Sequence, residues 1–305
     1  MEKKIGMEKG SNKMTYAGYK SFIENEFDIL DRDGNVVPFK LFPVQEAYLK
    51  LMGEDYKDMN GVREIILKAR QEGFSSFILA IFAVDFICKP NSVSICIAHK
   101  RDVTQKLFRK VKFYVESYCK RHGFDINSYL VSDNKNEMEH RANGSYFYIG
   151  TAGSKVGGRG STAQNLLFSE AAFYQDTEII TAQEIIEGSS QQVPQGAGKI
   201  FIESTANGFG NYYQLEWDRA VKRESNYRAR FFSWEKFYDQ EWIDQKKKDF
   251  QNEERFLQEY PRTPEEAFVH SGTPFFDMKM LSYQSEKNAI NPIKMGRLAQ
   301  DGKWI

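Results

Sequence analysis

The sequence has little of what secreted, zinc-stabilised or membrane-spanning proteins need. Only three of its 305 residues are cysteine, and its four histidines form no H-x-x-x-H pattern. An odd cysteine count without metal-ligand spacing favours reduced thiols over a disulfide framework or a zinc site. Residues 1–14 contain no apolar segment typical of a signal peptide, and the longest apolar run, Phe77–Cys88, is too short to span a membrane. We therefore expect a cytoplasmic protein with no membrane contact.

The sequence also lacks a net charge, since 42 Lys and Arg balance 42 Asp and Glu. This balance argues against a protein whose whole surface binds nucleic acid, although it leaves room for local basic patches. Aromatic residues make up 14% of the chain, which excludes a disordered protein. A chain of this length has room for about two domains and buries roughly 75% of its unfolded surface.

Short apolar runs alternate with helical patterns in the middle of the chain. This alternation predicts βαβ units and an α/β fold with a mostly parallel sheet flanked by helices. Such sheets bind ligands at the carboxyl ends of their strands. Beyond about residue 225, aromatic residues among dense charges predict amphipathic helices. The predicted strands are 65–67, 93–98, 145–150, 165–168 and 199–203, and the main predicted helices are 75–87 and 103–119.

A basic loop follows the first predicted strand and leads directly into an apolar helix. Compared with the phosphate-loop pattern G-x-x-x-x-G-K-[ST], Gly73 and Ser75 match the second glycine and the hydroxyl. Phe74 stands at the lysine position, and Lys68 replaces the first glycine. The segment predicts either a phosphate loop whose cations are Lys68 and Arg70, or a basic turn that Ser75 caps at the helix N-terminus.

Another predicted strand ends in an acid, at Ser169-Glu170. Nucleotide hydrolases place a carboxylate at such a strand end to orient a water molecule near the γ-phosphate. Glu170 would have this role, whereas Ser169, which stands where an aspartate is usual, could reach a metal only through water. The alternative is an exposed acid with no catalytic role.

Small polar side chains follow the fifth predicted strand, at Ser204, Thr205 and Asn207. At a strand end they could detect the γ-phosphate and transmit its loss to a neighbouring element, or they could form an ordinary loop. Arg159 lies between glycines and could be an arginine finger or part of a surface turn. Gln45 follows Phe42 in a predicted helix, and its amide could bind both edges of an adenine.

Two basic stretches are candidates for DNA contact. Residues 100–122 carry eight Lys and Arg against two acids, and helical spacing places Lys106, Arg109 and Lys110 near one face. The second stretch, 219–230, includes Arg228 and Arg230. A solvated helix face remains the alternative for the first stretch.

Together, and in this order, these segments resemble the ATPase half of the large terminase subunit of tailed bacteriophages. The Lys-x-Arg-Gln-x-Gly-x-Ser loop, the apolar-Ser-Glu-Ala-Ala strand end and the Ser-Thr-Ala-Asn-Gly segment are similar to that family's phosphate loop, acidic strand and coupling motif. The resemblance covers roughly residues 40 to 300. It implies a RecA-like core of the additional-strand (ASCE) P-loop type with a small, mainly helical lid, and it implies ATP and Mg²⁺ as ligands.

The resemblance also assigns roles to individual residues. It implies that Glu170 is catalytic, that Arg159 is a candidate arginine finger, and that Ser75 holds Mg²⁺ with Ser169 or Glu170 through water. It implies γ-phosphate coupling by Ser204, Thr205 and Asn207. The ATP-binding residues that it implies are Gln45, Lys68, Arg70, Gln71, Gly73, Phe74, Ser75 and Ser76.

The implied partners are double-stranded DNA, a portal protein, a small terminase subunit and other copies of the chain in a ring, in the host cell cytoplasm. We expect an N-terminal arm and adenine-side segment at 1–60, the ATPase core at 61–228, and a helical lid and linker at 229–305. No cluster of acids on apolar strands follows residue 275, so we expect the family's C-terminal nuclease domain to be absent from this chain. A helicase-like or repair DNA-dependent ATPase and a non-catalytic nucleotide-binding assembly module remain alternatives.

Overall fold

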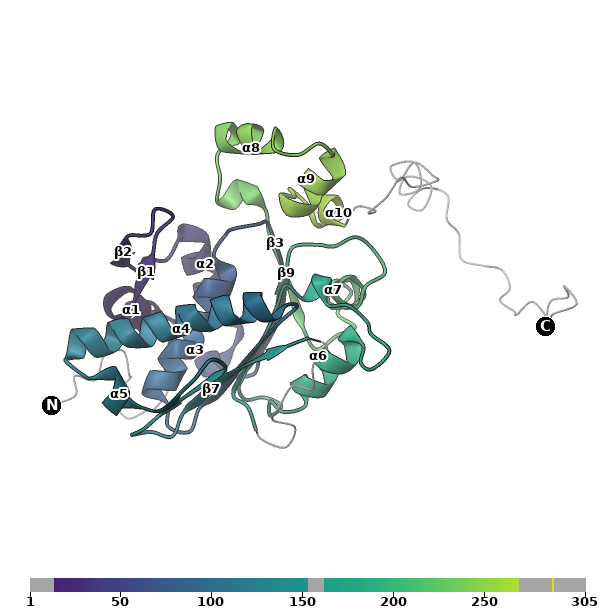
Figure 1. Cartoon of the computed structure of the whole chain (residues 1–305). Helices are drawn as coiled ribbons and strands as arrows, with labels where there is room; N and C mark the ends of the chain where they lie inside the picture. The colour runs from purple at the N-terminus through teal and green to yellow at the C-terminus, as the bar shows by residue number, and fades with distance from the viewer. Residues whose placement is uncertain (1–13, 153–161, 269–286, 288–305) are drawn as a thin grey trace, which may run out of the picture. The chain divides into compact units, whose positions relative to one another are not determined.

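The computed structural model describes residues 14–152 and 162–268, and Lys287 alone. The chain divides into two compact units, Met1–Val269 and His270–Ile305, and every described residue except Lys287 lies in the first. Figure 1 shows this unit as a sheet with helices on both of its faces. No helix within the described ranges is long and apolar enough to cross a membrane.

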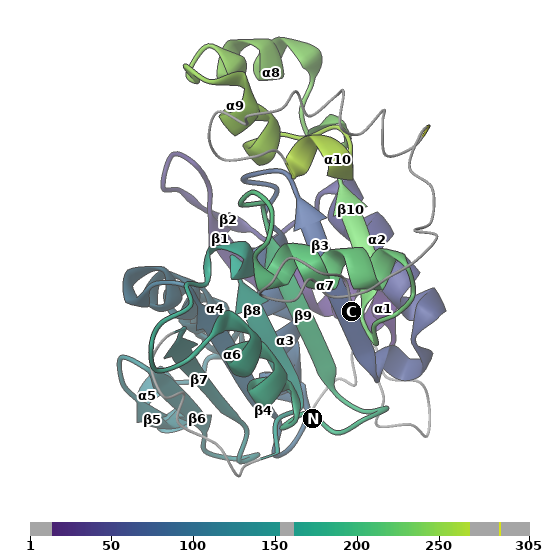
Figure 2. The same cartoon turned by 90° about the vertical axis from the view of Figure 1, so that its right-hand side faces the viewer.

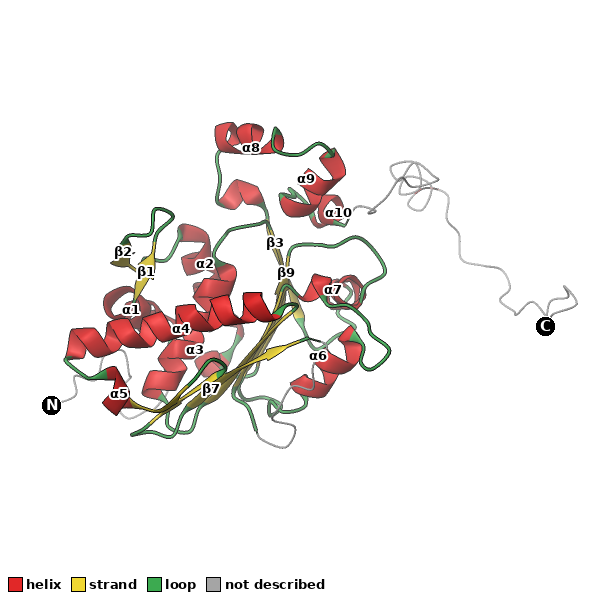
Figure 3. Ribbon diagram, viewed as in Figure 1, coloured by secondary structure: helices red, strands yellow, loops and turns green. Residues whose placement is uncertain are grey.

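The described strands form one eight-stranded sheet in the order β10-β3-β9-β8-β4-β7-β6-β5 (Figure 2), together with a separate β1–β2 hairpin (Figure 3). All pairs from β10 to β7 are parallel, whereas β6 and β5 form an antiparallel edge. The bounds are β1 Asp28–Leu30, β2 Val36–Pro38, β3 Val62–Lys68, β4 Val93–Ala98, β5 Leu130–Asp133, β6 Glu137–His140, β7 Tyr146–Thr151, β8 Asn165–Ser169, β9 Lys199–Ser204 and β10 Arg228–Phe232.

Helices cover both faces of this sheet. Figures 1 and 2 together show α1 to α4 on one face and α6 and α7 on the other. The longer helices are α1 Tyr16–Glu26, α2 Pro43–Asp55, α3 Phe74–Cys88, α4 Arg101–His122, α6 Ala182–Ser190, α7 Tyr212–Val221, α8 Gln240–Lys247 and α9 Glu253–Glu259. The short ones are α5 Ile126–Tyr129, α10 Pro264–Ala267, and the 3₁₀ turns η1 Lys57–Met59, η2 Ala171–Phe173 and η3 Trp234–Lys236.

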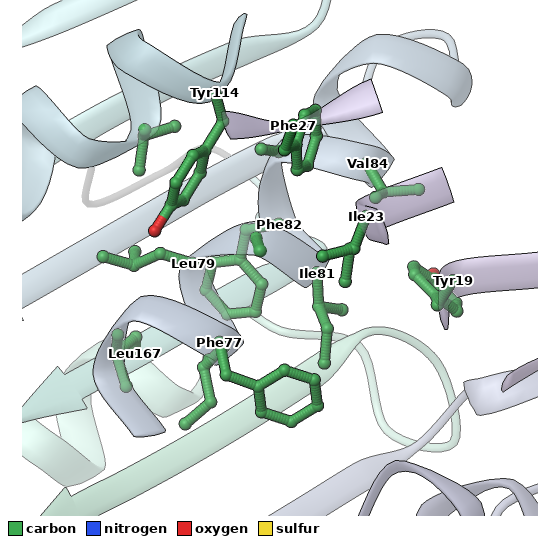
Figure 4. Close-up of a cluster of buried hydrophobic side chains, with 14 of the residues drawn as sticks. Tyr19, Ile23, Phe27, Phe77, Leu79, Ile81, Phe82, Val84, Tyr114 and Leu167 are labelled. Carbon is green, nitrogen blue, oxygen red and sulfur yellow. The ribbon is translucent and has the colours of Figure 1, made fainter. Parts of the chain in front are cut away.

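Helix α3 is apolar on all sides because it lies between the sheet and the helices α1 and α4. Figure 4 shows Phe77, Leu79 and Phe82 of this helix among side chains from α1 and α4, including Ile23 and Tyr114. A second apolar cluster fills the opposite face, beneath α6 and α7. A third, small cluster joins Ala69, at the carboxyl end of β3, to aromatic residues of the segment 234–260.

The predicted α/β class and mostly parallel sheet are confirmed, and all five predicted strands lie in the sheet. The strand β10 was missed because its sequence, Arg228-Ala229-Arg230-Phe231-Phe232, carries two charges. Arg230 is nevertheless held within the protein: its Nε donates to Glu64 Oε2 of β3 at 2.8 Å, and it also pairs with Asp55. This ion pair fixes β10 beside β3, and the strand crosses the boundary expected at residue 228.

Candidate functional site

Three neighbouring parallel strands end at the same edge of the sheet and bring the predicted site together. β3 ends at Lys68, β8 ends at Ser169 just before Glu170, and β9, which lies between them, ends at Ser204. Ligands of open α/β sheets bind at such carboxyl ends. The sheet order therefore brings the end of β3 together with two strand ends that follow it by more than a hundred residues in the sequence.

The loop between β3 and α3 has the backbone of an anion-binding turn. Gln71 and Gly73 both have positive φ, of 63° and 73°. The conformation therefore favours glycine at position 73, and a Cβ there would also come within 2.8 Å of Gln45 Nε2 and displace that amide. Gly73 is the N-cap of α3, and no side chain caps this end. The open N–H groups of the first turn therefore suit an anionic ligand.

Ser75 does not cap the helix, contrary to one of the two alternatives from the sequence. Its Oγ donates instead to Glu203 Oε1 at 2.7 Å, and Ser169 Oγ donates to the same carboxylate oxygen at 2.6 Å. Glu203 is fully buried on β9. Sequence reasoning did not select Glu203 as a site residue. Its only signal was its position directly before Ser204, at the end of a predicted strand.

Lys68 connects the loop to both acids of the site. Its side chain is only 5% exposed, and its Nζ lies 3.3 Å from Glu170 Oε1 and 3.3 Å from Glu203 Oε2. Burial alone would lower the pKa of Lys68, but Glu170 and Glu203 raise it above its ordinary value. The lysine is therefore a permanent cation at the edge of the sheet.

Glu170 has an unusual backbone conformation, with φ 55° and ψ 47°. A left-handed conformation costs a non-glycine residue roughly 1–2 kcal/mol, and such residues cluster at functional sites. Ser204 stabilises this turn, because its Oγ lies 3.4 Å from Glu170 Oε2 and accepts from the Ala172 amide at 3.2 Å. Asn207 Nδ2 donates to Ala172 O at 3.0 Å. The predicted coupling segment is therefore bonded to the turn that carries the acid.

Three other predicted ATP-binding residues, Gln45, Arg70 and Phe74, already have contacts within the protein. Both ends of the Gln45 amide are used within the protein: Nε2 donates to Glu72 O at 3.0 Å, and Oε1 accepts from Phe42 N at 3.2 Å. The exposed Arg70 forms an ion pair with Glu259 at 3.2 Å. Phe74 packs in the core against Phe232, with ring centroids 4.3 Å apart. The side chain of Phe74 thus faces the core, so it can offer a ligand only its backbone N–H.

Solved structures with a similar fold include two large terminases. The HK97 bacteriophage large terminase is 17% identical, with 90% of this chain and 52% of that chain covered and a TM-score of 0.57. The large terminase of a thermophilic bacteriophage is 12% identical, with 73% and 53% covered and a TM-score of 0.53. This chain has the large terminase fold. The likeness confirms the predicted RecA-like α/β core.

The chain spans about half the length of these two large terminases. The large terminase ATPase domain of Thermus phage P74-26 also matches, at 18% identity over 65% of this chain and 86% of that one, with a TM-score of 0.48. No family model and no curated protein match the sequence. At these identities the likeness to large terminases establishes the fold alone.

The candidate DNA-binding residues have different surroundings in the structure. Lys106 and Arg109 are exposed on α4 of the terminase fold. The side chain of Lys110 turns towards the first turn of α3, where its Nζ donates to Ser76 Oγ at 2.7 Å. The guanidinium groups of Arg228 and Arg230 both pair with Asp55, and Arg230 is largely buried. Arg230 therefore has a structural role instead of the predicted contact with DNA. Arg159 lies outside the described residues.

The donor set at the strand ends fits a hard divalent cation. Ser75 and Ser169 offer hydroxyl oxygens, and Glu203 and Glu170 offer carboxylate oxygens, which are the ligand types that Mg²⁺ prefers. Among the described residues, no group of three or more His, Cys, Asp or Glu could hold a metal by itself. Mg²⁺ usually keeps several waters and takes phosphate oxygens, so an ion here would depend on a bound nucleotide.

A buried acid in the loop makes stability depend on pH. Neither carboxylate oxygen of Glu72 has a hydrogen-bond partner among the described residues, and the Ala69 N–H beside it donates to Phe232 O. Burial raises the pKa of Glu72 to about 9, although the charge of Lys68 acts to lower it. Glu72 is therefore protonated at neutral pH. The free energy of unfolding decreases with each pH unit above the pKa that Glu72 has in the unfolded chain.

We expect the wild-type protein to lose up to about 2–3 kcal/mol of unfolding free energy between pH 5 and pH 7 through Glu72. The sign follows from its folded pKa, which lies above the unfolded value of about 4.3, so stability falls as the pH rises between the two. Glu72→Gln removes this slope and makes the variant more stable than wild type at pH 7. Urea unfolding at both pH values measures the effect, with the exposed Glu265→Gln as control. Parallel profiles for wild type and Glu72→Gln would contradict it.

Proposed function

We propose that this chain is the ATPase domain of a viral DNA-packaging motor, which hydrolyses ATP with Mg²⁺ to move double-stranded DNA into a prohead. The terminase fold supports the class of machine, and the strand-end site supports the chemistry. One observation carries the proposal: the loop cation Lys68 lies 3.3 Å from the strand-end acid Glu170, beside an uncapped helix N-terminus. Phosphoryl transfer needs this combination of positioning and charge.

In this proposal the loop binds the triphosphate. The backbone N–H groups of residues 73–76 and the side chains of Lys68 and Arg70 neutralise the phosphates. Arg70 must first leave its ion pair with Glu259. Gln45 supports the adenine side of the loop through its bond to Glu72 O. Glu170 accepts a proton from the attacking water, or orients it.

Mg²⁺ would neutralise charge on the phosphate oxygens when it is bound with ATP. We propose that Ser75 holds it, with Ser169 or Glu170 acting through water. Loss of the γ-phosphate would release Glu170, and the bonds of Ser204 and Asn207 to the Glu170 turn would carry that change into β9 and α7, with Thr205 between them.

The proposed partners follow from the proposed motor. DNA would be gripped by an exposed basic stripe on α4 that includes Lys106 and Arg109, with phosphate neutralisation as the main source of affinity. Other copies of the chain would form a ring in which Arg159 completes a neighbour's site. A portal protein, a small terminase subunit and a nuclease domain would complete the motor. The division into an arm at 1–60, a core at 61–228 and a lid at 229–305 remains a prediction.

A comparison of ATP turnover tests the proposal. We expect weak Mg²⁺-dependent phosphate release from the wild type and a decrease of at least about 100-fold for Lys68→Ala, because the cation of the loop is lost. Lys50→Ala removes a lysine that is exposed on α2, where it pairs with Glu54, so it serves as the control. Circular dichroism confirms that each variant is folded.

Two results would contradict the proposal. The first is a wild-type protein that neither binds nor hydrolyses ATP. The second is a folded Lys68→Ala variant with wild-type turnover, which would place hydrolysis elsewhere. ATP binding without any phosphate release would favour the non-catalytic assembly module, and strand separation without a portal would favour a helicase.

A further inference from the structure

The strand that usually supplies the metal-proximal carboxylate of a P-loop ATPase has none here. In such sites a loop hydroxyl and a strand-end aspartate hold Mg²⁺ together. β8 ends in Ser169, whose neutral hydroxyl donates its proton to Glu203 at 2.6 Å. An alcohol cannot replace the charge of a carboxylate, so Ser169 cannot act as the metal-proximal carboxylate.

A carboxylate reaches the same place from the neighbouring strand. Ser169 and Glu203 are register partners in the parallel pair β8–β9. Glu203 Oε1 accepts hydrogen bonds from both Ser169 Oγ and the loop hydroxyl Ser75 Oγ, at 2.6 and 2.7 Å. The bond from Ser75 is the one that a strand-end aspartate would otherwise receive. Since glutamate is one methylene longer than aspartate, it can span the distance from β9.

We infer that Glu203 is the metal-proximal carboxylate of this site and replaces the missing aspartate of β8 from the adjacent strand. The inference rests on the proposed ATPase function and changes its metal site. Glu203 orients Ser75 Oγ and accepts hydrogen bonds from water ligands of Mg²⁺. Ser169 orients the carboxylate and does not itself carry the metal's charge.

The charges around Glu203 favour a site for a bound cation over a purely structural ion pair with Lys68. Its side chain is 0% exposed, and its Oε2, which lies 3.3 Å from Lys68 Nζ, accepts no hydrogen bond from any other described residue. Its ion-pair partner Lys68 is shared with Glu170, at 3.3 Å from each acid. One lysine therefore faces two carboxylates. A divalent cation bound with the nucleotide would compensate the second negative charge.

The metal dependence of ADP affinity tests this inference without relying on turnover. Calorimetry measures the dissociation constant of ADP with saturating Mg²⁺ and with EDTA. The ratio of the two constants gives the gain in ADP affinity that is due to the metal. We expect Glu203→Gln to reduce this gain by about 10–100-fold while leaving the affinity in EDTA unchanged. The double variant Ser169→Asp with Glu203→Gln returns a carboxylate to β8 and should recover most of the gain. Glu241→Gln, on the exposed side of α8, is the control.

A second readout uses Mn²⁺ as the probe. Electron paramagnetic resonance of Mn²⁺ with ADP should show bound ion with the wild type and mostly free ion with Glu203→Gln. If Glu203→Gln does not fold, Glu203→Asp is used instead. This variant retains the charge beside Lys68 but withdraws the carboxylate from both hydroxyls. Its metal-dependent gain in ADP affinity should still be several-fold smaller than that of the wild type.

The outcomes separate this inference from the function on which it rests. A wild-type gain from Mg²⁺ that persists in Glu203→Gln, or in Glu203→Asp where that variant is used, would overturn the role of Glu203 and leave the ATPase proposal standing. Absence of ADP and ATP binding by the folded wild type would overturn both.

Discussion

Replacement of Glu170 by Gln is expected to lower ATP turnover by about 10²–10⁴-fold, the usual contribution of a general base. The amide keeps the size of the side chain and its place beside Lys68, but it cannot accept a proton from water. The left-handed backbone of Glu170 is also retained. ATP affinity should not decrease, because the substitution removes a negative charge next to the phosphates. Phosphate release and ATP binding, measured on the same preparations, separate these two effects.

The control for this prediction is Glu241→Gln, which neutralises an exposed acid of α8. Its turnover should equal that of the wild type. Hydrolysis by Glu170→Gln within about threefold of the wild-type rate would contradict the role of Glu170. Glu203 would then be the candidate for the acid that acts on water.

Replacement of Asp85 by Asn is expected to destabilise the protein by about 3–5 kcal/mol, the usual cost of removing one partner of a buried ion pair. Asp85 is 1% exposed on α3, and its carboxylate lies 2.6 Å from Lys199 Nζ and 2.8 Å from Lys89 Nζ. The Lys199 side chain is 2% exposed, so without Asp85 its charge would be buried and unpaired. Urea unfolding at pH 7 measures the loss.

The pH dependence of this contribution has a defined sign. Burial opposes the ionisation of Asp85, but Lys199 and Lys89 outweigh it and hold the pKa of Asp85 below its ordinary value. The stabilisation is therefore present above an unfolded pKa of about 4 and is lost as the pH falls further. Asp244→Asn, on the exposed side of α8, is the matched control. An Asp85→Asn variant that unfolds at the wild-type urea concentration would show that the pair is dispensable.

Much of the fold could be predicted because its signals are local. The apolar runs of β3, β4, β7, β8 and β9 and the long apolar α3 are visible in the sequence. β5 and β6 escaped prediction because they are short strands with many polar residues at one end of the sheet, and β10, the edge strand at the other end, did so because it carries arginines. Edge strands need less burial, so their hydrophobic pattern is weak.

The candidate site was predicted in part for the same reason. Lys68, Gly73 and Ser75 lie in one short segment that runs from the end of β3 to the start of α3, and Glu170 follows an apolar run, so each could be found from its own segment. Glu203 could not be recognised from its own segment, because its partners Ser75 and Ser169 lie 128 and 34 residues away. Likewise, nothing in the sequence near Lys110 or Arg230 indicated that one would turn to Ser76 and the other to Glu64.

The sequence by itself determined the α/β class, the loop, and the acids available at the strand ends. Only the tertiary structure decided which acid meets which hydroxyl and which basic residues remain exposed. The physical reason is that strand order and register are set by packing of whole elements against one another. Placing β9 between β3 and β8 brings Glu203 to Lys68, Ser75 and Ser169, and no local pattern specifies that neighbour.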